Sequence, residues 1–195
     1  MNQFDIYLSG VGGQGIGLLS ELIARAIDHS GQRVIGADTH GLAQRGGMVA
    51  SHIRMGQTVH SALVGKNRAD LCVSLERHEA LRAMNDYLKD GATLVYYDAV
   101  WQPLDVRMGT TKQIENVLIS DEASRRGITA IRVFEEGLQE ARMQNIVVSA
   151  VICKNSFIPG VNQKHFLSAM DDLMRGEMLV DNQRLFRSIV EKEQK

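Results

Sequence analysis

A glycine-rich turn between an apolar run and a helical pattern is the feature of this sequence that most restricts its fold. Residues 4–9 mix aromatic and aliphatic side chains, as strands do, and they lead into Gly10-Val11-Gly12-Gly13-Gln14-Gly15. Isoleucine and leucine then recur at helical spacing over residues 16–27, and Gly31 can take the left-handed conformation that ends helices. We therefore predict a strand, a tight turn and a helix, which is how a βαβ unit begins.

Strand-like and helix-like segments continue to alternate along the chain. Residues 48–55 and 58–64 flank Gly56-Gln57, and because glycine there permits a type II′ turn, we expect an antiparallel hairpin. Asp90-Gly91 is expected to form a turn. The other predicted strands cover residues 33–37, 69–75, 92–97, 117–119 and 129–133, and the predicted helices cover residues 76–88 and 122–126.

The last third of the sequence is predicted to be helical. Helices are expected over residues 144–154, 163–174 (with Asn162 as the N-cap) and 182–192, with a break at Pro159-Gly160. The whole pattern favours an α/β fold with a Rossmann-like, doubly wound, mainly parallel sheet, an antiparallel hairpin and a C-terminal helical extension. We expect a single domain over residues 1–195, with the helical tail over about 140–195.

Charge and hydrophobicity exclude several classes of protein. Lys and Arg number 22 and Asp and Glu 23, whereas nucleic-acid-binding domains usually carry clustered basic residues. Because no apolar run is long enough to cross a bilayer and the first residues lack the pattern of a signal peptide, we expect a cytoplasmic protein without membrane or nucleic-acid partners. Cys72 and Cys153 stand alone in apolar stretches, which favours core positions over a metal site or a disulfide.

The glycine turn is suited to a phosphorylated ligand. Its glycines let the backbone approach a ligand closely, and the N–H groups of a helix N-terminus attract phosphate. Dinucleotide binding also requires an acidic residue about 20 residues further on. Asp38 comes late for that role, and Thr39-His40-Gly41 replaces the usual ribose-binding turn. Tight packing of the helix on the strand, without any ligand, is the alternative.

A second glycine-containing segment, His40-Gly41-Leu42-Ala43-Gln44-Arg45-Gly46-Gly47, precedes the predicted hairpin. Its glycine N–H groups and the fixed fork of the Arg45 guanidinium would suit a phosphate, a carboxylate or the backbone of a neighbouring subunit. An ion pair between Arg45 and a carboxylate of this chain is the simpler alternative. A lone His40 is more often structural than an acid–base group.

Together, the two glycine segments resemble the gamma-type domain of 2-oxoacid:ferredoxin oxidoreductases, which shares the turn at Gly10 to Gly15 and an Arg-Gly-Gly segment before a hairpin. The resemblance is close over the first hundred residues. Further on it is limited to Asn145 with the apolar helix after it and to a late helix that contains Asn182, and residues 99–114 depart from the family. The segment from His40 to Gly47 is most similar to the beta subunit of indolepyruvate ferredoxin oxidoreductases, which implies an arylpyruvate substrate.

The resemblance implies a thiamine diphosphate enzyme that decarboxylates a 2-oxoacid, passes electrons through iron–sulfur clusters to ferredoxin and releases an acyl-coenzyme A. This sequence has no Gly-Asp-Gly segment to hold magnesium and diphosphate, and two cysteines cannot ligate a [4Fe-4S] cluster. We therefore expect thiamine diphosphate, magnesium and the clusters on a large partner subunit. Ferredoxin would be a partner of this chain only indirectly, through that subunit. The family's gamma-type domain packs against the thiamine-binding parts and could help to enclose coenzyme A. A homodimer is a further expected association.

We predict no catalytic residue and no metal ligand in this chain, and we assign a ligand- or partner-binding role to the two glycine segments. The candidate residues are Gly10, Gly12, Gly13, Gln14, Gly15, His40, Gln44, Arg45, Gly46 and Gly47. Two alternative functions remain open. A stand-alone nicotinamide-dependent dehydrogenase would use the glycine turn, and a non-catalytic assembly module would need no catalytic residues.

Overall fold

A six-stranded sheet organises the chain in the computed structural model, which describes residues 3–38, 47–101, 106, 108–110, 112–138 and 140–192. β3 runs antiparallel to both of its neighbours, and the pairs that join β1, β4, β5 and β6 are parallel. The strands, in their order across the sheet, are β2 (Val34–Asp38), β3 (Met48–Met55), β1 (Phe4–Val11), β4 (Ala69–Ser74), β5 (Leu88–Tyr97) and β6 (Thr129–Val133).

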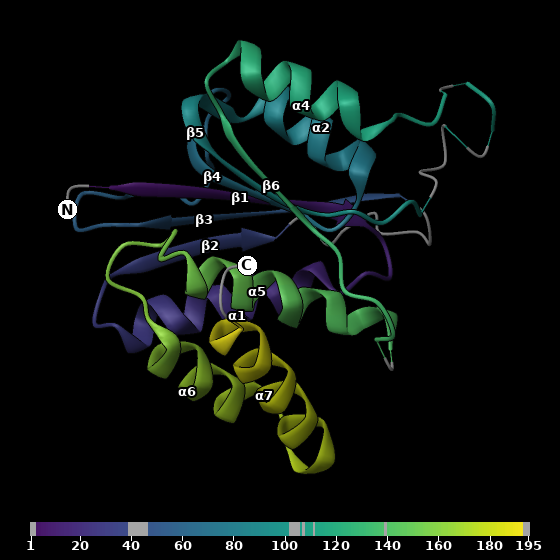
Figure 1. Ribbon diagram of the computed structural model, residues 1–195. Helices are drawn as coiled ribbons and strands as arrows, with labels where there is room; N and C mark the ends of the chain where they lie inside the picture. The colour runs from purple at the N-terminus through teal and green to yellow at the C-terminus, as the bar shows by residue number, and fades with distance from the viewer. Residues whose placement is uncertain are drawn as a thin grey trace.

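Helices cover both faces of this sheet (Figure 1). On one face lie α2 (Arg77–Asp86) and α4 (Asn116–Arg125), and on the other lie α1 (Ile16–His29) and α5 (Gln144–Lys154). The 3-10 helix Ala141–Met143 leads into α5. Further from the sheet, α6 (Gln163–Leu173) packs on α1 and α7 (Gly176–Glu191) packs on α5. The predicted α/β fold with a C-terminal helical extension is therefore confirmed.

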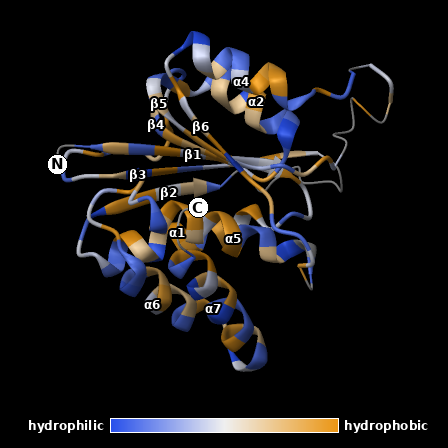
Figure 2. Cartoon of the chain, viewed as in Figure 1, coloured by the Kyte–Doolittle hydropathy of each residue, from blue (hydrophilic) through white to orange (hydrophobic). Residues whose placement is uncertain are grey.

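Apolar side chains are buried on both sides of the sheet (Figure 2). Successive residues of a strand point to opposite faces, so Ile6 and Leu8 join the core beneath α1 while Tyr7 joins the core beneath α2. Strands buried on both faces have nearly continuous apolar sequences, as β1 and β4 do. α5 is apolar around its whole circumference because β5 and β6 contact it on one side and α7 on the other.

The predicted hairpin over residues 48–64 is wrong. Residues 48–55 form β3, but residues 58–64 form no strand, and β3 lies between β1 and β2. Both edges of β3 are thus occupied, which leaves no place for a second hairpin strand. Residues 58–64 return as a loop held by side chains of β3. The guanidinium of Arg54 donates to the carbonyl of Ser61 (3.0 Å), and Nδ1 of His52 accepts the N–H of Val64 (3.1 Å).

Three further predictions need correction. Asp90-Gly91 is not a turn before a strand but lies within β5, at an irregularity where Gly91 N–H donates to the carbonyl of Arg126 (3.1 Å). Residues 117–119 are not a strand, because α4 is one helix that begins at Asn116, with Ile119 and Ala123 as its buried positions. Finally, α7 begins at Gly176, earlier than the predicted start at residue 182.

The chain connections diverge between β1 and β4. After β1 the chain enters α1 on one face of the sheet, and after β4 it enters α2 on the other face. In open α/β sheets, ligands bind in the crevice at the carboxyl ends of two such strands. The glycine turn lies at this point. Of the helices that the structure describes, none is both long and apolar enough to cross a lipid bilayer.

Candidate functional site

The glycine turn connects β1 to α1 and leaves the start of α1 without a side-chain cap. Gly12 N–H donates to the carbonyl of Gly47 (2.8 Å), which ties the turn to the residue before β3. Gly15 is the N-cap of α1, with a left-handed backbone (φ 85°) and no side chain to accept hydrogen bonds from the first helical turn. The backbone N–H groups of that turn are therefore available to a ligand.

Two of the candidate residues face the interior and shape the turn. Gln14 is fully buried, its Oε1 accepts the N–H of Val11 (2.7 Å), and its Nε2 donates to the carbonyl of Leu75 (2.6 Å). These hydrogen bonds connect the turn to the end of β4. Gly10 lies against α1, since a Cβ there would come within 2.8 Å of Cδ1 of Ile16. The side chain of Gln14 thus holds the turn in place and does not reach its outer surface.

A cavity of about 380 Å³ opens beside the turn. Gly12, Gly13 and Gly15 contribute backbone to its wall, and Leu18 and Val49 contribute apolar side chains. Two polar side chains, Arg142 and Asn145, reach the cavity from the 3-10 helix and from the first turn of α5. The volume and the composition of this cavity match small-molecule sites, which are largely apolar pockets of about 300–1,000 Å³ with a few polar groups.

Asn145 carries an unusual buried amide. The residue is only 1% exposed, and its Nδ2 has no hydrogen-bond partner among the described residues. It lies directly behind the N-cap of α1, because a Cβ on Gly15 would be 3.1 Å from this nitrogen. Sequence reasoning connected Asn145 with the family resemblance but missed Arg142 and Asn145 as site residues. The available signal was the polar pair Gln144-Asn145 at the start of an otherwise apolar helix.

A network of hydrogen bonds and ion pairs lies at the same edge of the sheet as the glycine turn, after the end of β5. The buried carboxylate of Asp98 follows β5 and accepts hydrogen bonds from Arg77 Nε (2.7 Å), Asn116 Nδ2 (2.8 Å) and Arg132 Nε (2.6 Å). Burial alone would raise the pKa of Asp98, but the hydrogen bonds from Asn116, Arg77 and Arg132 outweigh it and hold this pKa below its usual range. Asp98 therefore joins β5 to α2, α4 and β6.

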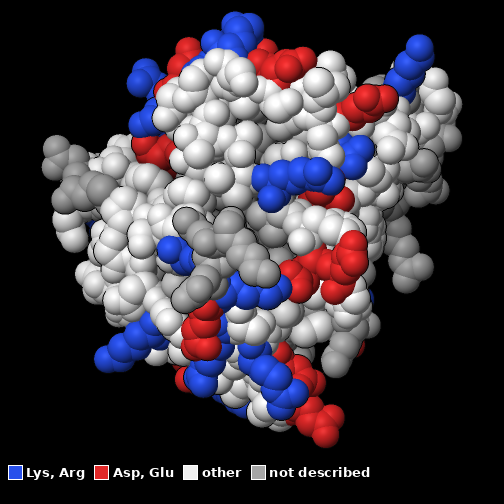
Figure 3. Space-filling view, viewed as in Figure 1, with Lys and Arg blue, Asp and Glu red and all other residues white. Residues whose placement is uncertain are grey.

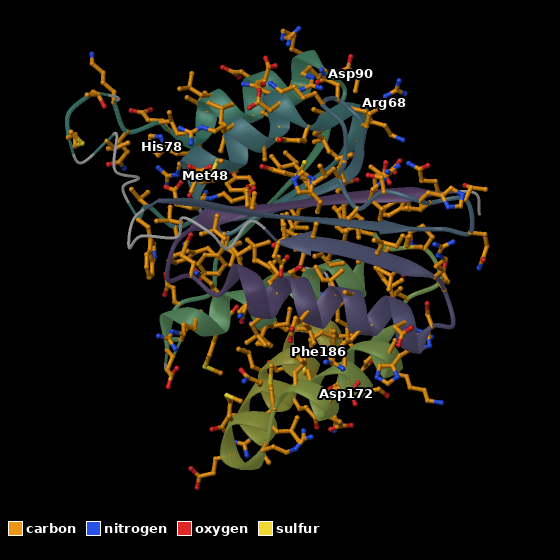
Figure 4. The ribbon with its side chains drawn as sticks, turned by 180° about the vertical axis from the view of Figure 1, so that it is seen from behind. Met48, Arg68, His78, Asp90, Asp172 and Phe186 are labelled. Carbon is orange, nitrogen blue, oxygen red and sulfur yellow. The ribbon has the colours of Figure 1, made fainter. Side chains whose placement is uncertain are left out.

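Glu76 and His78 lie at the start of α2, outside the residues that line the cavity. The carboxylate of Glu76 accepts the N–H of Glu79 (3.0 Å) as an N-cap, and burial raises its pKa. Nε2 of His78 accepts the N–H of Ile114 (3.2 Å), and burial lowers the pKa of the imidazole. Figure 4 shows His78 and Met48 at the same end of the sheet. Both polar groups are therefore engaged in holding local structure.

The candidate residues from the two glycine segments differ in what the structure shows of them. Gly12, Gly13 and Gly15 line the cavity, Gly47 contacts Gly12, and Gly10 and Gln14 support the turn from inside. His40, Gln44, Arg45 and Gly46 lie outside the described residues. The binding role of all ten residues stays a prediction.

The position of Asp38 does not suit dinucleotide binding. Because β3 lies between β1 and β2, Asp38 at the end of β2 is two strand spacings, or about 10 Å, from the line of β1. Its carboxylate accepts a hydrogen bond from Ser20 Oγ of α1 (2.9 Å). In dinucleotide-binding folds the ribose-binding acid ends the strand adjacent to the glycine turn. The dehydrogenase hypothesis thus loses its expected ribose ligand.

The described residues do not fit an iron–sulfur cluster or a metal ion. No three His, Cys, Asp or Glu residues in the described part of the chain lie close enough together to hold a metal. The two cysteines are buried in different cores, Cys72 beneath α2 and Cys153 in α5, and burial raises the pKa of the Cys153 thiol to about 11. Four thiolates at one point are needed for a cubane cluster.

Comparisons with known proteins agree with the fold. The family model for pyruvate ferredoxin/flavodoxin oxidoreductases matches residues 5–191. Indolepyruvate oxidoreductase subunit IorB of Thermococcus kodakarensis is 38% identical over 109 residues, which cover 56% of this chain and 54% of that protein. The matched stretch thus spans about half the length of this relative.

Solved structures give two further matches. The gamma subunit of a keto/oxoacid ferredoxin oxidoreductase from Geobacter sulfurreducens has a TM-score of 0.64 at 18% identity, and the match covers 96% of each chain. A 2-oxoglutarate:ferredoxin oxidoreductase from Magnetococcus marinus, solved with 2-oxoglutarate, coenzyme A and succinyl-CoA bound, has a TM-score of 0.71 at 17% identity. This second match covers 96% of the present chain and 30% of the other. At these identities the two structures share the α/β fold with this chain.

Proposed function

The chain belongs to the pyruvate ferredoxin/flavodoxin oxidoreductase family, and we propose that it is the small, non-cofactor-bearing subunit of a thiamine-dependent 2-oxoacid:ferredoxin oxidoreductase. The proposed substrate is indolepyruvate or another arylpyruvate, and the products are an acyl-coenzyme A, carbon dioxide and reduced ferredoxin. The family match over residues 5–191 is the observation that carries this proposal. Since the proposed acceptor is ferredoxin, we expect the complex to work in the cytoplasm.

The proposal assigns the redox chemistry to a large partner subunit. In the described part of this chain no group of residues suits a metal ion, and the two cysteines lie in separate cores. We therefore expect thiamine diphosphate, magnesium and the [4Fe-4S] clusters on the partner. The present chain would contribute the surface around the glycine turn, where it would contact the partner and help to enclose coenzyme A. On its own, the chain is expected to be inactive.

Co-expression with the large subunit tests the proposal. The purified complex should reduce a viologen dye or ferredoxin when it receives coenzyme A and indolepyruvate or phenylpyruvate. Each subunit alone should be inactive, and mixing the two should restore the activity. Failure of the complex with indolepyruvate, phenylpyruvate, pyruvate and 2-oxoglutarate would overturn the assignment. Full activity of the large subunit without this chain would instead favour the assembly role.

A further inference from the structure

The loop that follows β3, here called the strap (residues 58–64), lies against the sheet without forming a strand. Val59 and Val64 anchor the strap, because both side chains are buried. The guanidinium of Arg54 on β3 holds its middle by donating to the carbonyl of Ser61 (3.0 Å). An arginine side chain keeps its charge at any physiological pH, so this contact does not change with acidity.

His52 holds the end of the strap in a way that depends on the protonation of its ring. Its Nδ1 accepts the N–H of Val64 (3.1 Å), and a backbone N–H can only donate. Nδ1 must therefore be unprotonated, and the single ring proton of the neutral imidazole lies on Nε2. In a doubly protonated ring both nitrogens are donors, so the N–H of Val64 would lose its acceptor and face another donor.

The surroundings of the imidazole keep it neutral while the strap is closed. His52 is only 6% exposed, and burial lowers the pKa of its ring. The rings of Tyr7 on β1 and Tyr87 at the end of α2 lie edge-on to it, with centroids 5.1 and 5.6 Å away. Tyrosine is uncharged below about pH 9, so these rings offer no negative charge to an imidazolium.

The other ionisable groups near His52 do not supply such a charge either. The described carboxylates on this side of the sheet form ion pairs with basic side chains: Asp5 with Arg54, Asp70 with Lys89, and Glu79 with Arg82. Cys72 on β4 pairs with Tyr7, and burial raises the pKa of its thiol. On β2 the residue opposite His52 is the uncharged Ala37, and His60 on the strap is exposed.

The charge of the whole chain does not favour protonation of this ring. The net charge is -1, and Figure 3 shows acidic and basic side chains interspersed over the displayed face, so that face creates no strong potential of one sign. The local contacts of His52 therefore decide when its ring takes up a second proton.

We propose that His52 is an acid-sensitive latch: the closed strap requires the neutral imidazole, and protonation of the ring releases residues 58–64 from β3. In the open state the imidazole meets water and has the ordinary histidine pKa of about 6.5. Because the open state binds the proton more readily, the ratio of closed to open molecules is highest above this pH. Below it, the ratio falls by up to about tenfold for each pH unit, until the lower pKa of the closed state is reached. Opening exposes Val59 and Val64 and uncovers this side of β3.

Amide hydrogen exchange of the full-length chain, followed by NMR from neutral to mildly acidic pH, tests the latch. The protection of the Val64 N–H, corrected for the intrinsic exchange rate at each pH, should fall below about pH 6.5 by up to tenfold per pH unit. The buried Ile128, whose N–H donates to the carbonyl of Ala123 (2.8 Å), is the internal control and should keep its protection. Protection of Val64 that stays constant, or that falls in parallel with that of Ile128, would refute the proposal.

Two matched substitutions identify the titrating group. His52→Asn removes the titrating ring, and its Oδ1 can replace Nδ1 as the acceptor, so the protection of Val64 should no longer depend on pH. His60→Asn makes the same change at an exposed position of the strap and should keep the wild-type pH dependence. A fall in protection that persists in His52→Asn, or that disappears in His60→Asn, would assign the effect to another group.

Nitrogen-15 spectra of the imidazoles in the wild type give a readout that needs no variant to fold. At neutral pH the ring proton of His52 should lie on Nε2, because Nδ1 must accept the N–H of Val64. A proton on Nδ1 would leave that N–H without its acceptor and would overturn the latch. The inference concerns the fold of this chain and does not depend on the proposed function.

Discussion

At the scale of single residues, Gly15 illustrates how the turn combines a left-handed backbone with close packing. Its φ is 85°, and a Cβ there would lie 3.1 Å from Nδ2 of Asn145. Gly31 has a similar φ of 76°, but a Cβ there would meet nothing within 4 Å. A left-handed backbone costs a residue with a Cβ about 1–2 kcal/mol. Gly31→Ala should therefore lose about that much stability, and Gly15→Ala should lose more.

Urea denaturation of the two variants measures this difference, because both carry the same backbone penalty and only Gly15→Ala adds the contact with Asn145. Equal losses of stability in the two variants would show that Asn145 moves away freely. The close packing of Gly15 against Asn145 would then be an incorrect description.

The sequence could predict the turn but not the roles of all its residues. Glycines between an apolar run and a helical pattern are a local signal, and the structure places the turn there. The inward side chain of Gln14 could not be inferred in this way, because its hydrogen-bond acceptor, the carbonyl of Leu75, is distant in the sequence. In the sequence, a polar residue in a glycine turn looks like a ligand-binding residue. Only the position of the neighbouring strand shows that its side chain points inward.

At the scale of elements, Asp98 joins β5 to α2, α4 and β6. Asp98→Asn keeps the shape of the side chain but removes a buried charge that faces Arg77 and Arg132. We expect the free energy of unfolding at pH 7 to fall by about 3 kcal/mol, which is at the lower end of the range for removing one partner of a buried ion pair. Glu122→Gln breaks an exposed pair with Arg125 on α4, where solvent screens the charges, and should cost much less.

The effect of Asp98→Asn should depend on pH in a defined direction. The pKa of Asp98 in the folded protein lies below its usual value, which is about 3.9 in the unfolded chain. A group with a lowered pKa stabilises the fold above its unfolded pKa and loses that contribution as pH falls through the folded pKa. The difference between wild type and variant should thus be constant from about pH 8 to 5 and shrink below about pH 4. A difference that grows on acidification would contradict the ion-pair description.

Element prediction succeeded where an apolar run was long and failed where strand pairing decided the outcome. Residues 144–154 were predicted as a helix and form α5, because an apolar run of that length exceeds a typical strand. Residues 48–64 suggested a hairpin, since Gly56-Gln57 separates two strand-like runs. The actual neighbours of β3 are β1 and β2, and this choice depends on long-range pairing that adjacent residues do not encode.

At the scale of the whole molecule, the candidate site exists only because distant segments meet. The glycine turn follows the first strand, whereas Arg142 and Asn145 come from the last third of the chain, beyond the whole sheet. The sequence indicated an anion-binding turn at the start of α1. It could not show that α5 begins beside the same turn, because that follows from the packing of α1 and α5 on one face. The fold class was therefore more predictable than the site.

The proposed contact with a large subunit is also a property of the whole molecule, because one face must be accessible to that subunit. Met48 is 51% exposed and lies next to Gly47, which contacts the glycine turn. Val180 on α7 is similarly exposed, at 54%, but lies in the outer helical layer. A carboxylate buried in an interface without a partner costs several kcal/mol. Met48→Glu should thus weaken the affinity for the large subunit about tenfold or more, while Val180→Glu should have little effect.

Co-purification of each variant with a tagged large subunit measures this contrast, and circular dichroism of the free chain confirms that both variants fold. If Val180→Glu disrupts the complex and Met48→Glu does not, the partner binds the outer helices α6 and α7, and the glycine turn faces solvent. If Met48→Glu disrupts the complex and Val180→Glu does not, the partner covers the edge of the sheet where the cavity beside the glycine turn opens.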